Sequence, residues 1–378
     1  MPRPRVSCSR RTRPERSRSW PAVWTSPPHH LHPRHPEPVR PPDRLGAPPL
    51  GRTRSAHRQP RRCPERRLQV ITYLQAIVLG LVQGVTELFP ISSLGQAVIL
   101  PTVFGWDTLA QAQSQPESFY LAFIVGMHVA TATALLIYFW SDWRGIIAGF
   151  FRTIGHGAQE RKMPWSVIRN VDERMAWLLV VATIPAGLMG VAFEHVFRVT
   201  FAKPLYAAVF LMVNGMILLV GERFRRRSEV KAVAADHGTY AGTDNRRLET
   251  LEFSEAVIVG VAQVFALIAG ISRSGITMVV GLVRGLSHED AARFSFLLAT
   301  PIILAAGIYK LPDLFGPLGN GIRMQVLVGS VAAGIAAYVA VRFLMKYFET
   351  RTLTPFAIFC LVEGAVCTVG FALTGHTF

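Results

Sequence analysis

The acidic residue Glu87 and the basic residue Arg273 each stand in an apolar stretch of sequence, beside serine residues. A carboxylate at membrane depth costs at least ~2.5 kcal/mol and usually marks a site or a pathway. An arginine guanidinium presents a planar fork of donors that matches phosphate oxygens two at a time. Because a carboxylate can accept a proton and a guanidinium can neutralise an anion, the two types together suit chemistry on a phosphate or diphosphate group.

Further polar residues surround Glu87. Gln83 lies four residues before it, so both side chains project from one face of a helix. Ser92, Ser93 and Gln96 follow it closely. Their hydroxyl and amide groups can donate to phosphate oxygens, whereas Gln83 taken alone also suits a hydrogen bond between helices.

Arg273 lies in the segment Gly-Ile-Ser-Arg-Ser-Gly-Ile-Thr, which also contains Ser272, Ser274 and Thr277. Hydroxyls, a guanidinium and accessible backbone N–H groups therefore fall within a few residues. A helix that restarts here adds its positive end, as at other anion sites. An alternative interpretation is that Arg273 pairs with Glu87 and holds two segments together, which does not exclude a ligand.

The two groups of residues occupy equivalent places in an internal repeat. Residues 76–95 align without gaps on residues 256–275, and six of the twenty positions are identical. In each copy an apolar helix is followed by a Ser- and Gly-rich break, after which an apolar stretch resumes. Hydrocarbon tolerates such a break only where its backbone groups line a cavity or bind something polar. Paired broken helices in two halves therefore predict a site at the repeat interface.

Long apolar segments predict an all-α integral membrane protein. Each is close to the ~20 residues that cross a bilayer. The six predicted spans are 119–140, 175–195, 204–222, 291–311, 324–346 and 354–375. The repeated elements, 72–103 and 254–284, are predicted to form re-entrant helical hairpins, so that each half has one hairpin and three spans.

The odd number of spans in each half makes the predicted repeat inverted, with one hairpin entering from each face. We expect a first repeat at 69–222, a cytoplasmic linker at 223–253 and a second repeat at 254–378. Loops on the side of this linker carry 18 Lys and Arg residues, against four on the other side. The positive-inside rule makes the basic side cytoplasmic.

Residues 1–68 differ in composition from the rest. They hold 17 arginines and 15 prolines but four acidic residues, and they account for +13 of the formal charge of +16. Such a stretch buries too little apolar surface to offset its ordering entropy, so we expect a disordered tail, or a start codon assigned too early with the true start near Val70. Because the excess charge belongs to this tail, no nucleic-acid partner is expected.

A phosphate site inside a bilayer predicts a lipid diphosphate ligand, whose tail stays in hydrocarbon while its head group reaches the two breaks. Other polar residues of the spans are less informative. His128 either lines the site or hydrogen-bonds a neighbouring helix. Glu194 and His195 are expected near an interface, where water solvates them. No partner of Glu363 is evident from the sequence.

The segments QGVTELFPISSLG and GISRSGIT resemble the two motifs of the undecaprenyl-diphosphate phosphatase family, the bacitracin-resistance type. The family's first motif is Glu/Gln-x-x-x-Glu followed by Pro-x-Ser-Ser-x-Gly-His, and its second is Pro-Gly-x-Ser-Arg-Ser-Gly-x-Thr. The resemblance covers residues 72–375. It implies a multi-pass hydrolase of the bacterial plasma membrane that removes one phosphate from undecaprenyl diphosphate. That reaction recycles the carrier lipid for peptidoglycan synthesis and gives bacitracin resistance.

The resemblance also implies roles for residues. Glu87, Ser93 and Arg273 correspond to catalytic residues, and either Ser93 or a water oriented by Glu87 attacks the terminal phosphorus. Family members use a divalent cation, Mg²⁺ or Ca²⁺, which Glu87 would share with diphosphate oxygens. Whether the protein forms a homodimer is left open. The expected diphosphate-binding residues are Gln83, Ser92, Gln96, Ser272, Ser274 and Thr277.

Three positions depart from the family pattern. Gln96 stands where the family has histidine, and it cannot take up a proton as histidine does. Ala269 replaces a proline, and Phe359 with Cys360 replaces Tyr-Arg. The first departure leaves two alternatives open: a polyprenyl-phosphate transporter that alternates access between its halves, and a catalytically weakened paralogue. A large gain of hydrolysis in Gln96→His would indicate the weakened enzyme.

Overall fold

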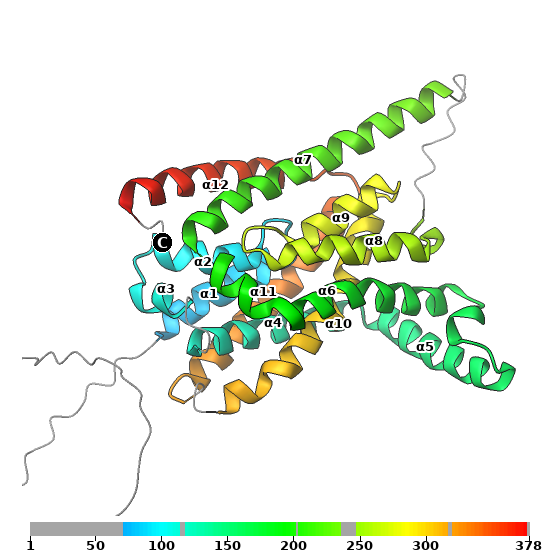
Figure 1. Ribbon diagram of the computed structural model, residues 1–378, viewed down its shortest axis with the longest axis horizontal. Coiled ribbons are helices and arrows are strands. Elements are labelled where there is room, and N and C mark those ends of the chain that lie inside the picture. The colour runs from blue at the N-terminus through cyan, green and yellow to red at the C-terminus, as the bar shows by residue number, and fades with distance from the viewer. Residues whose placement is uncertain (1–70, 114–117, 202, 236–246, 317–319, 376–378) are drawn as a thin grey trace, which may run out of the picture. The chain divides into compact units, whose positions relative to one another are not determined.

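The computed structural model describes residues 71–113, 118–201, 203–235, 247–316 and 320–375, and the predicted tail at 1–68 lies outside them. Every regular element within these ranges is helical, as the sequence predicts (Figure 1). The α-helices are α1 Tyr73–Thr86, α2 Ser93–Val103, α3 Asp107–Gln113, α4 Phe119–Tyr138, α5 Trp140–Glu160, α6 Val171–Phe201, α7 Pro204–Ala235, α8 Phe253–Val264, α9 Arg273–Val283, α10 His288–Phe315, α11 Arg323–Phe348 and α12 Thr354–Thr374.

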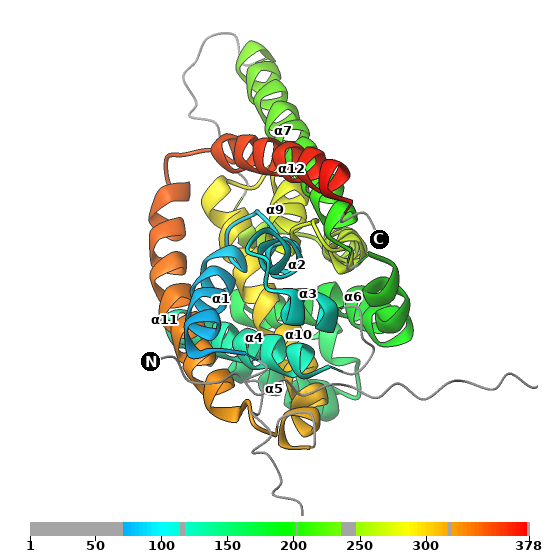
Figure 2. The ribbon, with the colours of Figure 1, turned by 90° about the vertical axis from the view of Figure 1, so that its left-hand side faces the viewer.

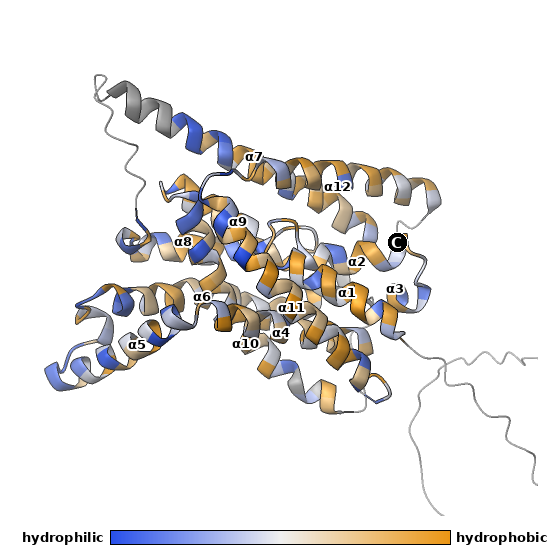
Figure 3. Ribbon diagram, turned by 180° about the vertical axis from the view of Figure 1, so that it is seen from behind, coloured by the Kyte–Doolittle hydropathy of each residue, from blue (hydrophilic) through white to orange (hydrophobic). Residues whose placement is uncertain are grey.

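Six of the described helices are long and apolar enough to cross a membrane, which confirms the six predicted spans. They are α4, α6, α7, α10, α11 and α12. Large apolar side chains such as Val191, Ile308 and Leu373 are 71–82% exposed on their outward faces, as hydrocarbon requires. Hydrophilic residues gather instead on α5 and on the part of α7 that extends beyond its apolar span (Figure 3).

Each repeated element forms two short apolar helices separated by a non-helical break. The first break joins α1 to α2, and the second joins α8 to α9 and contains a 3₁₀ turn at Phe265–Leu267. Ser92 and Ser272, which are equivalent in the repeat, cap the helices that follow. Their Oγ atoms accept hydrogen bonds from Gly95 N at 3.2 Å and Gly275 N at 3.1 Å. The repeat in sequence is therefore also a repeat in local structure.

Small residues bring α1 and α11 into close contact, and Figure 2 shows α11 running beside α1 and α4. A Cβ added at Gly80 would lie 2.2 Å from Gly329 O, and one added at Gly84 would lie 2.2 Å from Ala333 O. Close backbone approach of this kind is typical of helices packed in a membrane. Because Glu87 follows Gly84 by less than one turn, this contact also sets the position of the carboxylate.

Substituting Gly84 with alanine is expected to destabilise the protein by about 1–3 kcal/mol, since the new methyl group meets the α11 backbone and cannot be accommodated without movement. Thermal unfolding in one detergent measures the effect. Gly187→Ala on α6 is the matched control, because no heavy atom lies within 4 Å of its added Cβ. Equal melting temperatures for the two variants would contradict the tight contact.

The segment 141–174, one of the predicted basic loops between the spans, contains the helix α5. Its buried residues recur on one face, and that face packs on α6. Trp177 of α6 donates from Nε1 to Thr153 Oγ1 of α5 at 3.0 Å. Of the Lys and Arg residues of this segment, only Arg144 and Arg152 lie on α5, whereas Arg161, Lys162 and Arg169 lie in the connection to α6.

Candidate active site

The breaks of the two repeated elements lie against each other. Ser92 Oγ donates to Ile271 O at 3.2 Å and accepts from Gly270 N at 3.2 Å. In the other direction, Ser274 Oγ donates to Phe89 O at 3.2 Å. Gly270 has a φ of 105° and lies too close to the α7 backbone for any side chain. Segments that are far apart in sequence therefore meet at one junction, which we call the tip junction.

Glu87 and Arg273 form an ion pair at the tip junction. Arg273 Nη2 donates to Glu87 Oε1 at 2.7 Å, and the two side chains are 16% and 5% exposed. The sequence leaves open whether Arg273 binds a ligand or pairs with Glu87. In the structure Arg273 pairs with Glu87, and this pairing is compatible with a ligand. An ion pair withdrawn from water is stable only if further hydrogen bonds satisfy its remaining atoms.

The second oxygen of Glu87 accepts such hydrogen bonds from two side chains. Ser93 Oγ donates to Glu87 Oε2 in a short hydrogen bond, and Gln83 Nε2 donates to the same atom at 3.0 Å. Gln83 reaches it from one turn earlier on α1, as the four-residue spacing predicts. Four of the predicted site residues, Gln83, Glu87, Ser93 and Arg273, are thus in direct contact around one carboxylate.

His128 of α4 is a fifth member of this group. Its Nε2 lies 3.2 Å from Glu87 Oε2 and 3.2 Å from Gln83 Nε2. Its Nδ1 lies 2.9 Å from Ile124 O. Because a carbonyl oxygen can only accept, Nδ1 carries a proton, and Nε2 is the nitrogen that can exchange one with Glu87. His128 is therefore adjacent to Glu87 and also contacts a neighbouring helix, so both roles that its sequence position leaves open are compatible with the structure.

Two helices begin at the tip junction. α2 starts at Ser93 and α9 starts at Arg273. The first N–H groups of a helix have no acceptor within it, and they form the positive end of the helix dipole. The first residue of each helix contacts Glu87 through its side chain. Both helix starts therefore belong to the tip junction, and helix starts of this kind favour anionic groups.

Comparisons with known proteins show the family to which the chain belongs. The family model described as "Bacitracin resistance protein BacA" matches residues 76–366. This chain belongs to the BacA family. A BacA-family relative from Frankia alni, named Undecaprenyl-diphosphatase 2, is 51% identical over 348 residues, which cover 80% of this chain and 99% of the relative. Another, from Mycolicibacterium paratuberculosis and named Undecaprenyl-diphosphatase, is 55% identical over 314 residues, with 80% and 98% covered.

Gln96, at the position of the BacA-family histidine, contacts a different part of the protein. Its Nε2 donates to Glu363 Oε2 of α12 at 2.7 Å. The hydrogen bond joins α2 to α12 and gives Glu363 a partner that sequence reasoning does not find. The predicted contact of Gln96 with a diphosphate stays a prediction, and the imidazole next to Glu87 comes from α4 instead.

The hydroxyls of the second BacA-family motif brace the start of α9. Ser272 Oγ lies 3.0 Å from Ser274 Oγ. Thr277 Oγ1 donates to Arg273 O at 2.8 Å and lies 2.6 Å from Ser295 Oγ. Because these groups already have protein partners, their observed role is to hold the Arg273 backbone. Their predicted role as diphosphate ligands stays a prediction.

Hydrogen-bond donors occupy both carboxylate oxygens of Glu87 in this structure. Glu87 Oε1 is taken by Arg273, and Oε2 is taken by Ser93 and Gln83. Mg²⁺ and Ca²⁺ require about six to eight oxygen ligands. In the described part of the chain, no group of three His, Cys, Asp or Glu side chains is arranged to hold a metal. The metal role predicted for Glu87, in which the ion is shared with diphosphate oxygens, stays a prediction.

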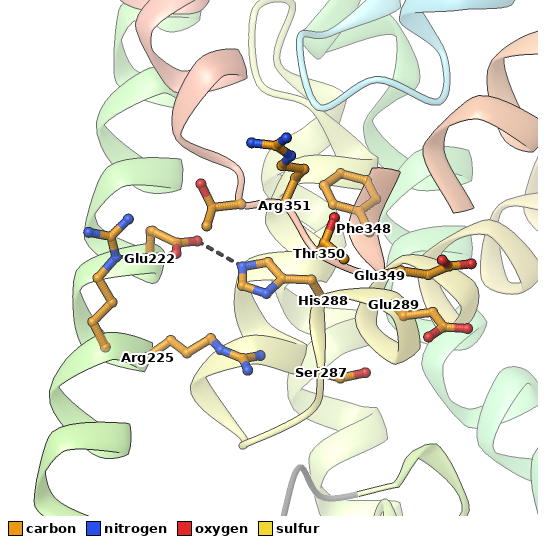
Figure 4. A pocket seen from close by; sticks show the side chains of 11 residues that line it. Glu222, Arg225, Ser287, His288, Glu289, Phe348, Glu349, Thr350 and Arg351 are labelled. Carbon is orange, nitrogen blue, oxygen red and sulfur yellow. Dashed lines mark hydrogen bonds and ion pairs between the residues drawn. The ribbon is translucent and has the colours of Figure 1, made fainter. Parts of the chain in front are cut away.

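A second charged region is separate from the tip junction. It is a cavity of about 360 Å³ between α7, the start of α10 and the turn from α11 to α12 (Figure 4). Glu222 Oε2 and His288 Nε2 form an ion pair there at 2.9 Å. None of the predicted site residues lines this cavity. The side chains of Glu194 and His195 lie outside the described part of the structure.

Proposed function

We propose that this protein hydrolyses undecaprenyl diphosphate to undecaprenyl phosphate and inorganic phosphate. The observation that carries the proposal is the contact of Ser93 and Arg273 with opposite oxygens of Glu87, beside the positive ends of two helices. Relatives that are 51% and 55% identical are named undecaprenyl-diphosphatases. The protein is then a multi-pass enzyme of the bacterial plasma membrane that recycles the carrier lipid for peptidoglycan synthesis and confers bacitracin resistance.

In this proposal the two repeats, at 69–222 and 254–378, have inverted topology. The pairs α1–α2 and α8–α9 are re-entrant hairpins that enter from opposite faces. Three spans in each half and the excess of basic loops on one side support this arrangement. It places the tip junction inside the bilayer, where the polyprenyl chain of the substrate stays in hydrocarbon while its diphosphate reaches Arg273.

The diphosphate is bound by charge. Its oxygens accept from Arg273 and from the first N–H groups of α2 and α9. Stabilising the charge of the transferred phosphoryl group is the main task of such catalysts, and donors fixed in advance do so without reorganising. Packing of Ser272, Ser274 and Thr277 around the start of α9 keeps these donors in place.

Ser93 is the nucleophile in the mechanism that this geometry favours. Its Oγ attacks the terminal phosphorus as its proton passes to Glu87 Oε2. The bond from that phosphorus to the bridging oxygen breaks, and undecaprenyl phosphate leaves. His128 Nε2 then accepts this proton from Glu87 and restores the carboxylate. Water attacks the phosphoserine and gives a proton to Glu87, the bond from phosphorus to Ser93 Oγ breaks, and inorganic phosphate leaves. Ser93 Oγ takes that proton back from Glu87, and His128 releases the first proton to water, which returns the site to its starting state.

Release of inorganic phosphate from undecaprenyl diphosphate by the purified full-length chain, reconstituted in lipid, tests the proposal. Hydrolysis above the rate of protein-free vesicles is expected. A transporter would move the lipid between leaflets without releasing phosphate. Absence of phosphate release, with or without added Mg²⁺ or Ca²⁺, would contradict the proposed function.

Replacing His128 with glutamine is expected to lower kcat for phosphate release by roughly 10²-fold, because the imidazole that exchanges a proton with Glu87 is lost.

Gln96→His is expected to change kcat by less than about threefold, because position 96 contacts Glu363 and not Glu87. Both variants are assayed for phosphate release. A large gain in Gln96→His would instead identify the present chain as a weakened enzyme whose missing base belongs at position 96.

A further inference from the structure

Asn214 of α7 is fully buried, and its amide group contacts the backbone of both breaks at once. Its Nδ2 donates to Pro90 O at 2.9 Å, in the break between α1 and α2. Its Oδ1 accepts from Ser272 N at 3.0 Å, in the break between α8 and α9. One planar group thus joins two segments that lie far apart in the sequence.

The atoms that Asn214 contacts are adjacent to the reacting groups. Pro90 lies midway between Glu87 and Ser93 in the sequence, and Ser272 immediately precedes Arg273. Neither break is a continuous α-helix, and each has only a few backbone hydrogen bonds of its own. The distance between the two breaks, and with it the placement of Arg273 against the carboxylate, therefore depends on groups that reach both of them.

An amide suits this position for a chemical reason. The site needs a donor for a carbonyl on one side and an acceptor for an N–H on the other, and the Asn side chain offers both within one rigid plane. The second N–H of Asn214 is also used, since Nδ2 lies 3.4 Å from Cys360 Sγ of α12. An apolar side chain of the same size would leave Pro90 O and Ser272 N without these partners, in a buried place where unpaired groups are costly.

We propose that Asn214 is a positioning residue for the hydrolysis, and that it sets the geometry between Glu87 and Arg273 by holding both breaks. The proposal rests on the proposed function and assigns no contact between Asn214 and the substrate. A misplacement of about 1 Å far from the reacting bond can lower a rate by roughly 10²-fold, so loss of this one amide is expected to affect turnover strongly.

Asn214→Leu removes both hydrogen bonds at similar volume and is expected to lower kcat by roughly 10²-fold while KM changes less than about threefold. Gln263→Leu is the matched control. Gln263 is also a buried amide, equivalent to Gln83 in the repeat, but it donates to Ala182 O of α6 and not to either break. Its loss is expected to lower the melting temperature and to leave kcat unchanged. Equal kcat in Asn214→Leu and wild type would overturn the proposal.

Asn214→Asp separates positioning from space filling. A neutral carboxyl reproduces the amide, with its O–H donating to Pro90 O and its C=O accepting from Ser272 N, whereas a carboxylate cannot donate. The ratio of variant to wild-type kcat is therefore expected to rise as pH falls from about 8 to about 5.5. The nearby titratable or charged groups are Cys360 and Glu363 on α12, Glu87 after α1 and Arg273 on α9. Dividing the variant rate by the wild-type rate at each pH removes the contribution that these groups make to both proteins. A low ratio that does not change with pH would contradict the hydrogen-bonding role.

A binding measurement keeps this inference distinct from the proposed function. Inorganic pyrophosphate is expected to raise the melting temperature of the wild type and of Gln263→Leu, and to stabilise Asn214→Leu much less. If the wild type releases no phosphate, the proposed function fails, and the pyrophosphate shift alone decides whether Asn214 aligns the two breaks. Equal stabilisation of all three proteins would overturn the inference.

Discussion

Replacing Glu87 with glutamine is expected to lower kcat for phosphate release by roughly 10³-fold, because the amide has almost the same shape but cannot take the proton of Ser93. The hydrogen bond from Gln83 and the contact with His128 also lose their anionic acceptor. Phosphate release under saturating undecaprenyl diphosphate measures the effect. Folding is checked by the melting temperature and by size-exclusion chromatography.

The control for Glu87→Gln is Glu222→Gln. Glu222 is another buried glutamate in an ion pair with a histidine, but it lies at the separate cavity of α7 and α10. Its loss is expected to reduce stability and to leave kcat near the wild-type value. Similar kcat values for the two variants would contradict a specific role of Glu87 in proton transfer.

Arg273→Lys is expected to lower kcat/KM by roughly 10²-fold to 10³-fold, although the positive charge is kept. The guanidinium fork can bind Glu87 through one nitrogen and phosphate oxygens through the others, whereas an ammonium is a point charge on a flexible stem. We expect KM to rise and kcat to fall, since the same donors act on the bound substrate and on the transferred phosphoryl group.

Arg293→Lys is the matched control for this substitution. Arg293 pairs with Asp142 and is 44% exposed, so its contribution is that of a surface ion pair. Activity is expected to stay at the wild-type level. Wild-type kcat/KM in Arg273→Lys would show that charge alone is sufficient at the tip junction and would remove the bidentate role of the guanidinium.

The sequence predicts the elements of the fold because their signals are local. Six apolar segments of membrane-spanning length and two Ser/Gly-rich breaks can each be recognised from one stretch of residues. The repeat adds one long-range relation, since equivalent breaks in two halves point to a common site. This relation predicts a site that contains Gln83, Glu87, Ser93 and Arg273. The structure brings these four residues into contact.

The contacts that sequence reasoning leaves open depend on helix rotation and on neighbours far away in the chain. His128 and Asn214 each stand alone in an apolar helix, and nothing in their local sequence says which way they point. Gln96 lies one turn after Ser93, yet it contacts Glu363 on α12 because α2 turns that side chain away from the carboxylate. Such pairings follow from how α2, α4, α7 and α12 pack, which a single sequence does not encode in any local pattern.

The helix α5 was missed for a related reason. Its charged residues suggest a loop, while its buried positions, among them Trp143, Ile146 and Gly149, show the helical spacing of a packed face. Net charge therefore does not decide whether a segment is helical, whereas the spacing of its apolar residues does.

A double-mutant cycle on kcat/KM for phosphate release tests the central claim, that Glu87 and Arg273 act as one unit at the tip junction. The variants are Glu87→Gln, Arg273→Gln and the combination of the two. We predict that the double variant loses no more activity than the worse single variant, because either change alone disables the shared site. Losses that multiply in the double variant would mean that the two residues act independently, and would contradict the proposed mechanism.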